Sequence, residues 1–509
     1  MQLTGMPPSR QRGQAMVLAV VCMLVFLVGA LVLFNTGMAV NKKIQLNNAA
    51  DAAAYSAAVQ EARTYNLIAY LNRAQVANEV CIAQMVSWHS WMNFAISGTD
   101  HFADAANDIG IALDITGVGA EVGVALNEMA AELKEAKQAM VTARNGMKTG
   151  FSFGIGLLSA ANVAYSDAAR FAADAQIGDI PKVVDTVIKQ NTSNAQGETN
   201  EKPAGLNAKS LVLLESQLAT ANTKFIKLYQ VPKSASASSN PSHTADADRL
   251  VNVIMQSRDG FSRERNGDLL GLHKRGGTDL ISYNRWAAMD TLQVKIKPFL
   301  VTLIDLPLAW GGAAAVKNQN GASFSNLIDQ DRGWTSPYRY DAKHDDRFNG
   351  ARDNSDAGNL GRLHPADPNN NDAILTNYQG LHSYEDTAAK MAIQPYASSN
   401  PEDETQALAV GPYFTVAVEQ KMSDVRTADN IQGMGGTPDV VAHDKTQNNK
   451  MTALASAQVY FDRPATLFLR NTDNDRELGN LFSPYWQARL IDTPNATKLE
   501  IFAADAVGL

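Results

Sequence analysis

The chain has 509 residues, a hydrophobic content of 45%, a charged content of 19% and a formal net charge of −8. This composition is typical of a globular protein and not of a disordered one, and the length allows a membrane segment with two or three folded units. The acidic balance excludes nucleic acid as an expected partner, because proteins that bind it carry clustered Lys and Arg.

The first predicted element is an apolar segment over residues 15–34, in which no side chain is charged. A helix of that length spans about 30 Å, the thickness of a bilayer's hydrocarbon core. We therefore predict a transmembrane helix over 15–34 that follows a short basic cytoplasmic head over 1–14. Such a signal anchor places the rest of the chain outside the cytoplasm. A secretory signal peptide, cleaved after Ala39, is the alternative.

The next part of the chain lacks helix breakers. No proline occurs between Pro8 and Pro181, and proline disrupts helix interiors. We therefore predict that the span continues into an Ala-rich helical stalk or bundle over 35–232. One face of its first helix has residues at 3–4 spacing, as expected for helix packing. The members of this predicted packing face are Tyr55, Ala58, Ala62, Tyr65, Ala69 and Val76. We interpret this face as an intramolecular seam, and contact with another subunit is the alternative.

Further helices are predicted along the stalk. A second helix is expected over 119–147, with an apolar stripe that we interpret as buried core. The stripe consists of Val122, Ala125, Met129, Leu133, Ala136, Met140, Ala143 and Met147. The glycine-rich segment 150–156 is expected to form a turn, and helices are expected over 157–175, from Pro181 onward, and over 207–229.

The last half of the chain has a different composition. A small, polar linker over 233–246 precedes it, and residues 247–509 contain alternating segments typical of strands. Strands are expected over 292–297, 299–306, 413–420 and 457–461. Long polar loops are expected over 317–372 and 423–450. The predicted fold class is α+β, with the N-terminal helices followed by a C-terminal domain built on antiparallel sheet.

The sequence predicts no catalytic residue, no cofactor and no metal site. Phosphate-loop, HExxH and CxxC spacings are absent. The one GxSxG match, at Ser152, follows a helical stripe, whereas a nucleophile elbow follows a strand. Residues 367–372 resemble the start of a calcium loop, but Asp372 and Tyr378 stand where an EF-hand requires Gly and Glu. The alternative is a membrane-anchored hydrolase that uses Asp345, Asp346 and Asp353.

Three segments carry a family resemblance. Residues 10–14 (RQRGQ) before the span and 48–54 (NAADAAA) after it resemble TadG-like proteins of the Flp (tight adherence, Tad) pilus-assembly machinery. Residues 482–490 (FSPYWQARL) are similar to the ending of long relatives in that group. The resemblance implies a bacterial inner-membrane protein with its bulk in the periplasm or outside the cell. Expected partners are the membrane, other pilus-assembly proteins or pilin subunits, and a second copy through the N-terminal helices.

The chain departs from related patterns in two ways. The Asp-x-Ser-x-Ser motif of von Willebrand A domains, found in many TadG-like proteins, is missing, so metal-dependent adhesion is not expected. A prepilin-type cut between Gly13 and Gln14 would place Leu18 fifth, where type IV pilins have Glu. We therefore expect an uncleaved anchor for pilus assembly, with a minor pilin or tip subunit as the alternative.

Overall fold

The computed structural model describes residues 12–116, 120–193, 203–233, 244–296, 304–318, 371–388, 409–421, 450–463 and 479–506. Most of the predicted head, most of the predicted linker and most of both predicted polar loops lie outside these residues.

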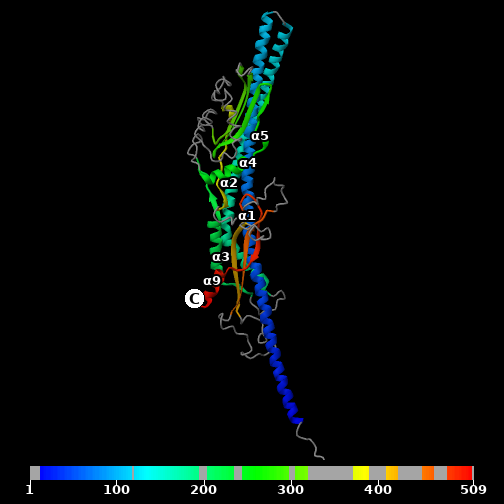
Figure 1. The fold of residues 1–509 in the computed structure, drawn as a ribbon, viewed down its shortest axis with the longest axis vertical. Coiled ribbons are helices and arrows are strands. Elements are labelled where there is room, and N and C mark those ends of the chain that lie inside the picture. Colours follow the sequence, from blue (N-terminus) through cyan, green and yellow to red (C-terminus); the bar gives the residue numbers. More distant parts are fainter. Residues whose placement is uncertain are drawn as a thin grey trace, which may run out of the picture. The chain divides into compact units, whose positions relative to one another are not determined.

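Two long helices dominate the described chain. Helix α1 spans Arg12–Thr116, so the apolar segment and the Ala-rich segment form a single helix (Figure 1). Helix α2 follows over Ala120–Thr192. The predicted order, an apolar helix that continues into long helices before an antiparallel sheet domain, is therefore confirmed, as is the α+β class.

The predicted turn at 150–156 is wrong, because these residues lie inside α2. The glycines serve close packing: a Cβ on Gly154 would lie 3.4 Å from the methyl carbon of Met85, and one on Gly156 would lie 3.2 Å from Cβ of Asn377. The predicted new helix start at Pro181 is wrong as well, since α2 runs through this residue. Proline already has a helical φ, and its missing N–H costs a long helix one hydrogen bond.

The helix predicted over 207–229 ends earlier. Helix α3 covers Ala208–Thr220, a π-helical turn η1 covers Ala221–Phe225, and strand β2 covers Ile226–Tyr229. Asn207 caps α3 by accepting hydrogen bonds from the backbone of Lys209 and Ser210. Strand β2 pairs with β8 (Tyr384–Thr387), and this non-local pairing overrides the local helical pattern.

Two larger sheets carry the C-terminal half. One has the order β1-β9-β10-β11, and its paired neighbours are antiparallel. Its strands are β1 (Gly205–Leu206), β9 (Ala409–Lys421), β10 (Lys450–Phe461) and β11 (Trp486–Ile491). The other has the order β3-β4-β5-β6-β7, antiparallel except for the β6–β7 pair. Its strands are β3 (Gly267–Leu269), β4 (Leu272–Ser282), β5 (Arg285–Ile296), β6 (Ile304–Ala315) and β7 (Ile374–Leu375).

Short helices complete the described chain. They are α4 (Ala245–Ser257), α5 (Gly260–Arg263), the 3-10 turn η3 (Asn371–Ala373) and α9 (Asn495–Ala506). The strands predicted over 292–297, 413–420 and 457–461 overlap β5, β9 and β10, and residues 304–306 of the strand predicted over 299–306 lie in β6. Residues 297 and 299–303 lie outside the described ranges.

The chain forms two compact units that are interleaved along the sequence. Unit 1 comprises residues 1–67, 172–227 and 387–509 and contains the four-stranded sheet. Unit 2 comprises residues 68–171 and 228–386 and contains the five-stranded sheet. Helix α1 contributes to both units. The domain boundaries proposed from the sequence, at 232 and 246, stay predictions.

Candidate functional site: the apolar helix and its buried carboxylates

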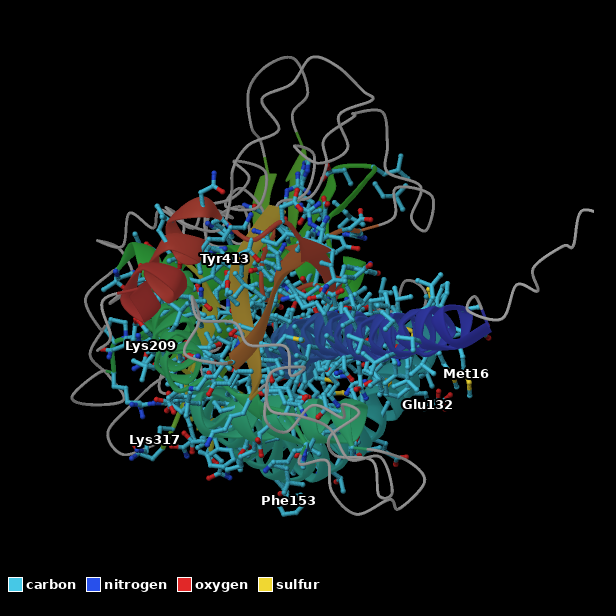
Figure 2. All side chains as sticks on the ribbon, turned by 90° about the horizontal axis from the view of Figure 1, so that it is seen from below. Met16, Glu132, Phe153, Lys209, Lys317 and Tyr413 are labelled. Carbon is cyan, nitrogen blue, oxygen red and sulfur yellow. The ribbon has the colours of Figure 1, made fainter. Side chains whose placement is uncertain are left out.

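The first part of α1 presents apolar side chains to its surroundings. Every side chain over residues 15–30 is exposed, so no described part of the chain covers this segment. Met16 projects from the helix in Figure 2. Among the described residues, this helix alone is long and apolar enough to cross a membrane. The predicted span is therefore a candidate transmembrane segment by both length and composition.

The predicted packing face lies farther along α1. Ala58, Ala62 and Tyr65 are buried in unit 1, whereas Tyr55 is 44% exposed. Ala69 and Val76 are buried and belong to unit 2. The chain itself thus covers five of the six residues, and Tyr55 is the member left for an outside contact. Self-association through this face stays a prediction.

An aromatic cluster surrounds Tyr65 in unit 1. The Tyr65 ring stacks on Phe225 with centroids 5.4 Å apart and meets Trp486 edge-on at 5.3 Å. Phe461 meets the same Trp486 ring at 5.3 Å. Such aromatic pairs add about 0.5–1.5 kcal/mol each beyond their buried area. The cluster therefore fixes the start of β11 on α1.

Asn66 adds polar contacts at the same place. Its Nδ2 donates to the carbonyl of Trp486, and its Oδ1 accepts from the Trp486 backbone N–H, both at 2.9 Å. Trp486 belongs to the C-terminal segment 482–490. Two of the three segments singled out in the sequence, 48–54 and 482–490, thus belong to unit 1.

Two glutamates of α1 are fully buried. Burial raises the pKa of Glu61, in unit 1, to about 7. Burial also raises the pKa of Tyr65, one turn later, and the neighbouring charge of Glu61 adds to this rise. In unit 2, burial raises the pKa of Glu79 to about 7. Both carboxyl groups therefore change protonation near neutral pH, which is unusual for glutamate.

Glu79 is the centre of a hydrogen-bond network in unit 2. Its Oε2 accepts from Nε1 of Trp286 and from the hydroxyl of Tyr378, each at 2.9 Å. Its Oε1 accepts from Nδ2 of Asn162 at 2.9 Å, and Oδ1 of Asn162 accepts from Nδ2 of Asn78 at 2.8 Å. The network connects α1, α2, strand β5 and the segment after β7. Because protein donors occupy these acceptor positions, the arrangement positions structural elements and offers no free general base.

Asp290 of β5 forms the second buried charge centre of unit 2. It accepts two hydrogen bonds from Arg265, at 2.8 and 3.0 Å, one from Nζ of Lys274 at 2.6 Å, and one from Oγ of Ser90 on α1 at 2.7 Å. Burial alone would raise the pKa of Asp290, but the charges of Arg265 and Lys274 outweigh this effect and lower it. The carboxylate is therefore ionised, fully partnered and structural.

The candidate catalytic and metal-binding residues do not form a site in the described structure. Ser152 lies within α2, and its Oγ accepts from the backbone N–H of Thr376 at 3.1 Å. Asp372 pairs with Arg144 at 3.1 Å and Lys148 at 3.8 Å. Within the described ranges, no group of three or more His, Cys, Asp or Glu side chains is arranged to hold a metal ion. Residues 367–370 and the carboxylates Asp345, Asp346 and Asp353 lie outside those ranges, as do the side chains of Gly13 and Gln14.

The buried polar residues of α1 were not predicted from the sequence. Beyond Ala69, the 3–4 spacing of the predicted face continues, but with polar side chains. The buried members are Asn72, Gln75, Glu79, Ser90, Asn93 and Ser97. The continued 3–4 spacing could therefore have predicted that these polar side chains are buried. Polar side chains on the inner face of a long helix must then find hydrogen-bond partners.

Comparisons with known proteins agree with the N-terminal resemblance. No curated protein and no solved structure matches this chain. Residues 13–60 match the family model described as "Putative Flp pilus-assembly TadE/G-like". The matched range covers the apolar span and the part of α1 that leads to Glu61. Through this segment, the chain is similar to the TadE/G-like proteins of Flp pilus assembly.

Proposed function

We propose that the chain is a non-enzymatic anchor in the assembly of a Tad/Flp-type adhesive pilus. It would sit in the bacterial inner membrane through residues 15–34, with its bulk in the periplasm. The observation that carries this proposal is the match over residues 13–60, which coincides with an exposed apolar segment and its helical continuation. Its partners would be the membrane, other pilus-assembly proteins and pilin subunits.

The mechanism would be mechanical and associative. Helix α1 is unbroken from the candidate span to Asn66, where the side chain holds the start of β11. A load on the anchor would therefore reach unit 1 through regular helix and not through a loop. Buried apolar area at the partner surface would supply the affinity.

N-terminal mass analysis of the native protein, from fractionated membranes and from sheared fibres, tests this role. An intact start at Met1 or Gln2, confined to the inner membrane, supports the anchor. A start at Gln14 in the fibre fraction overturns it in favour of a minor pilin or tip subunit. A start at Val40 points to a secreted protein.

A second experiment tests the hydrolase alternative. The combined substitution Asp345→Asn, Asp346→Asn and Asp353→Asn removes the carboxylates on which that alternative depends. The anchor role predicts unchanged piliation, measured by electron microscopy of complemented cells. Lost piliation with a normal amount of membrane-bound protein would contradict a non-enzymatic role.

A further inference from the structure

The C-terminal end of α1 and the N-terminal end of α2 form a helical hairpin. The residues at the contact between the two helices are very small. Ala103, Ala106, Gly110, Gly123 and Ala130 are buried there. A Cβ on Gly110 would lie 2.9 Å from the carbonyl oxygen of Gly123, so the backbones almost touch. All these residues belong to unit 2, and the hairpin extends beyond the five-stranded sheet in Figure 1. Large apolar side chains are therefore excluded from this contact.

The apolar stripe of α2, expected as core, is not buried. Val122, Ala125, Met129, Ala136 and Ala143 are exposed, and the other three members are intermediate. The prediction of a core role is wrong, because the helix contacts α1 through the neighbouring positions Gly123 and Ala130. The stripe lies about 90° around the helix from that contact.

Helix α1 adds a matching stripe to the same side of the hairpin. Trp88, Trp91, Phe102 and Ile109 fall on one 3–4 repeat, and each is exposed. With Gly110 opposite Gly123, the antiparallel register sets Ile109 near Val122 and Phe102 near Met129. At its base, the Trp88 ring lies 5.8 Å from Trp91. We call this two-helix surface the hairpin face.

The charged residues around the hairpin face limit the kind of partner that can bind there. The two lysines of this region are already used, because Lys134 pairs with Asp104 at 3.6 Å and Lys137 with Asp100 at 2.6 Å. Six other carboxylates of the hairpin have no cationic partner within the described chain. They are Asp108, Asp114, Glu121, Glu128, Glu132 and Glu135. Each of the four glutamates immediately precedes a residue of the α2 stripe. Together they form an acidic edge beside that stripe.

We propose that the hairpin face is a docking site for a basic amphipathic helix of another protein. Two adjacent apolar stripes on neighbouring helices can accept a third helix through contacts at i, i+3, i+4 and i+7 of that helix. The acidic edge favours Lys and Arg beside the apolar stripe of that helix. A second copy of this chain would bring the same negative charge, as would an anionic lipid surface. The inference goes beyond the anchor role and does not depend on it.

Two labelled peptides test the proposal on the full chain in zwitterionic nanodiscs. Both are about 20 residues long, to span the face, and share one leucine stripe; the polar side carries Lys in one and Glu in the other. Fluorescence anisotropy should show binding of the Lys peptide, weakening with salt, and no binding of the Glu peptide. Empty nanodiscs provide the background.

Matched variants decide whether the hairpin face is responsible. Ile109→Ser and Met129→Ser should each weaken binding of the Lys peptide by about tenfold. Ile111→Ser is the control, because Ile109 and Ile111 are 54% and 44% exposed but lie on different sides of α1. Circular dichroism confirms that each variant is folded.

Several outcomes would overturn the proposal. They are failure of the Lys peptide to bind, equal binding of both peptides, and equal loss in Ile109→Ser and Ile111→Ser. Mass photometry adds another: self-association that Ile109→Ser abolishes would assign the face to a second copy. Recruitment of the protein to anionic vesicles, lost in the same variant, would assign it to a lipid surface.

Discussion

Asn66 and Trp486 lie 420 positions apart and exchange two hydrogen bonds, so that the amide side chain pairs with the backbone at the start of β11. An asparagine carries both a donor and an acceptor, and here both are directed at one residue. The contact ties the helix that contains the TadE/G-like segment to the C-terminal strand. It gives unit 1 a polar clasp beside the aromatic cluster of Tyr65, Phe225 and Trp486.

Asn66→Ala should destabilise unit 1. The substitution leaves the N–H and carbonyl of Trp486 without these partners, which costs about 1–3 kcal/mol. Urea unfolding of the full chain in detergent, followed by tryptophan fluorescence, measures the loss. Asn47→Ala is the control, because Asn47 is exposed on the same helix. Equal stability of the two variants would show that the clasp contributes nothing.

Glu79 should make unit 2 more stable in mild acid. Its folded pKa of about 7 lies above the ordinary glutamate value of 4.5. Its contribution is therefore fully present below pH 4.5 and is lost as the pH rises through 7, by roughly 3 kcal/mol at most. Urea unfolding across this range measures the dependence, which the wild type should show more strongly than Glu79→Gln.

The Glu79→Gln variant should also be less stable than the wild type where Glu79 is ionised. Its amide nitrogen must face either Trp286 and Tyr378 or Asn162, and all three are donors to the native carboxyl group. The control is Glu132→Gln, at an exposed position that Figure 2 labels. An unchanged pH slope in Glu79→Gln would contradict the raised pKa.

Asp290 should give the opposite dependence on pH. Its folded pKa is lowered from 3.8, so its contribution is present above that value and is lost as the pH falls through the folded pKa. Asp290→Asn removes one partner of a buried ion cluster and should cost about 3–5 kcal/mol near neutral pH. The difference in unfolding free energy from the wild type should shrink in strong acid. A constant difference would mean that the charge of Asp290 is not what stabilises unit 2.

Local patterns predicted the parts of the fold that depend on local physics. A charge-free run over 15–34 is enough to identify an apolar helix, because a bilayer-length segment needs no distant partner. Alternation over 292–297 likewise located β5, and a strand was also expected within β9, although both strands begin before the predicted ranges. The Asn66–Trp486 clasp and the Glu79 network were not predictable, since their partners lie 83 to 420 residues away in the sequence.

Glycine caused the clearest error. The sequence segment 150–156 was interpreted as a turn because glycine weakens helices by about 1 kcal/mol. In α2, however, Gly154 and Gly156 lie where neighbouring side chains leave little room for a Cβ. The same ambiguity explains the misassigned stripe from Val122 to Met147: the small residues beside it made the contact, and the large ones stayed outside. Residue size alone does not tell which face of a helix is inward.

Glycine either permits a close contact between helices or only weakens the helix that contains it. One pair of substitutions separates these two roles. Gly110→Ala should destabilise the hairpin, because the new Cβ would lie 2.9 Å from the carbonyl oxygen of Gly123 and must push the helices apart. Gly146→Ala should stabilise the protein by about 0.5–1 kcal/mol, since nothing lies within 4 Å of its Cβ position and alanine favours helix. Thermal unfolding followed by circular dichroism measures both. Opposite signs are expected from the same chemical change in the same helix pair, and a stabilising Gly110→Ala would mean that the two backbones are not in contact.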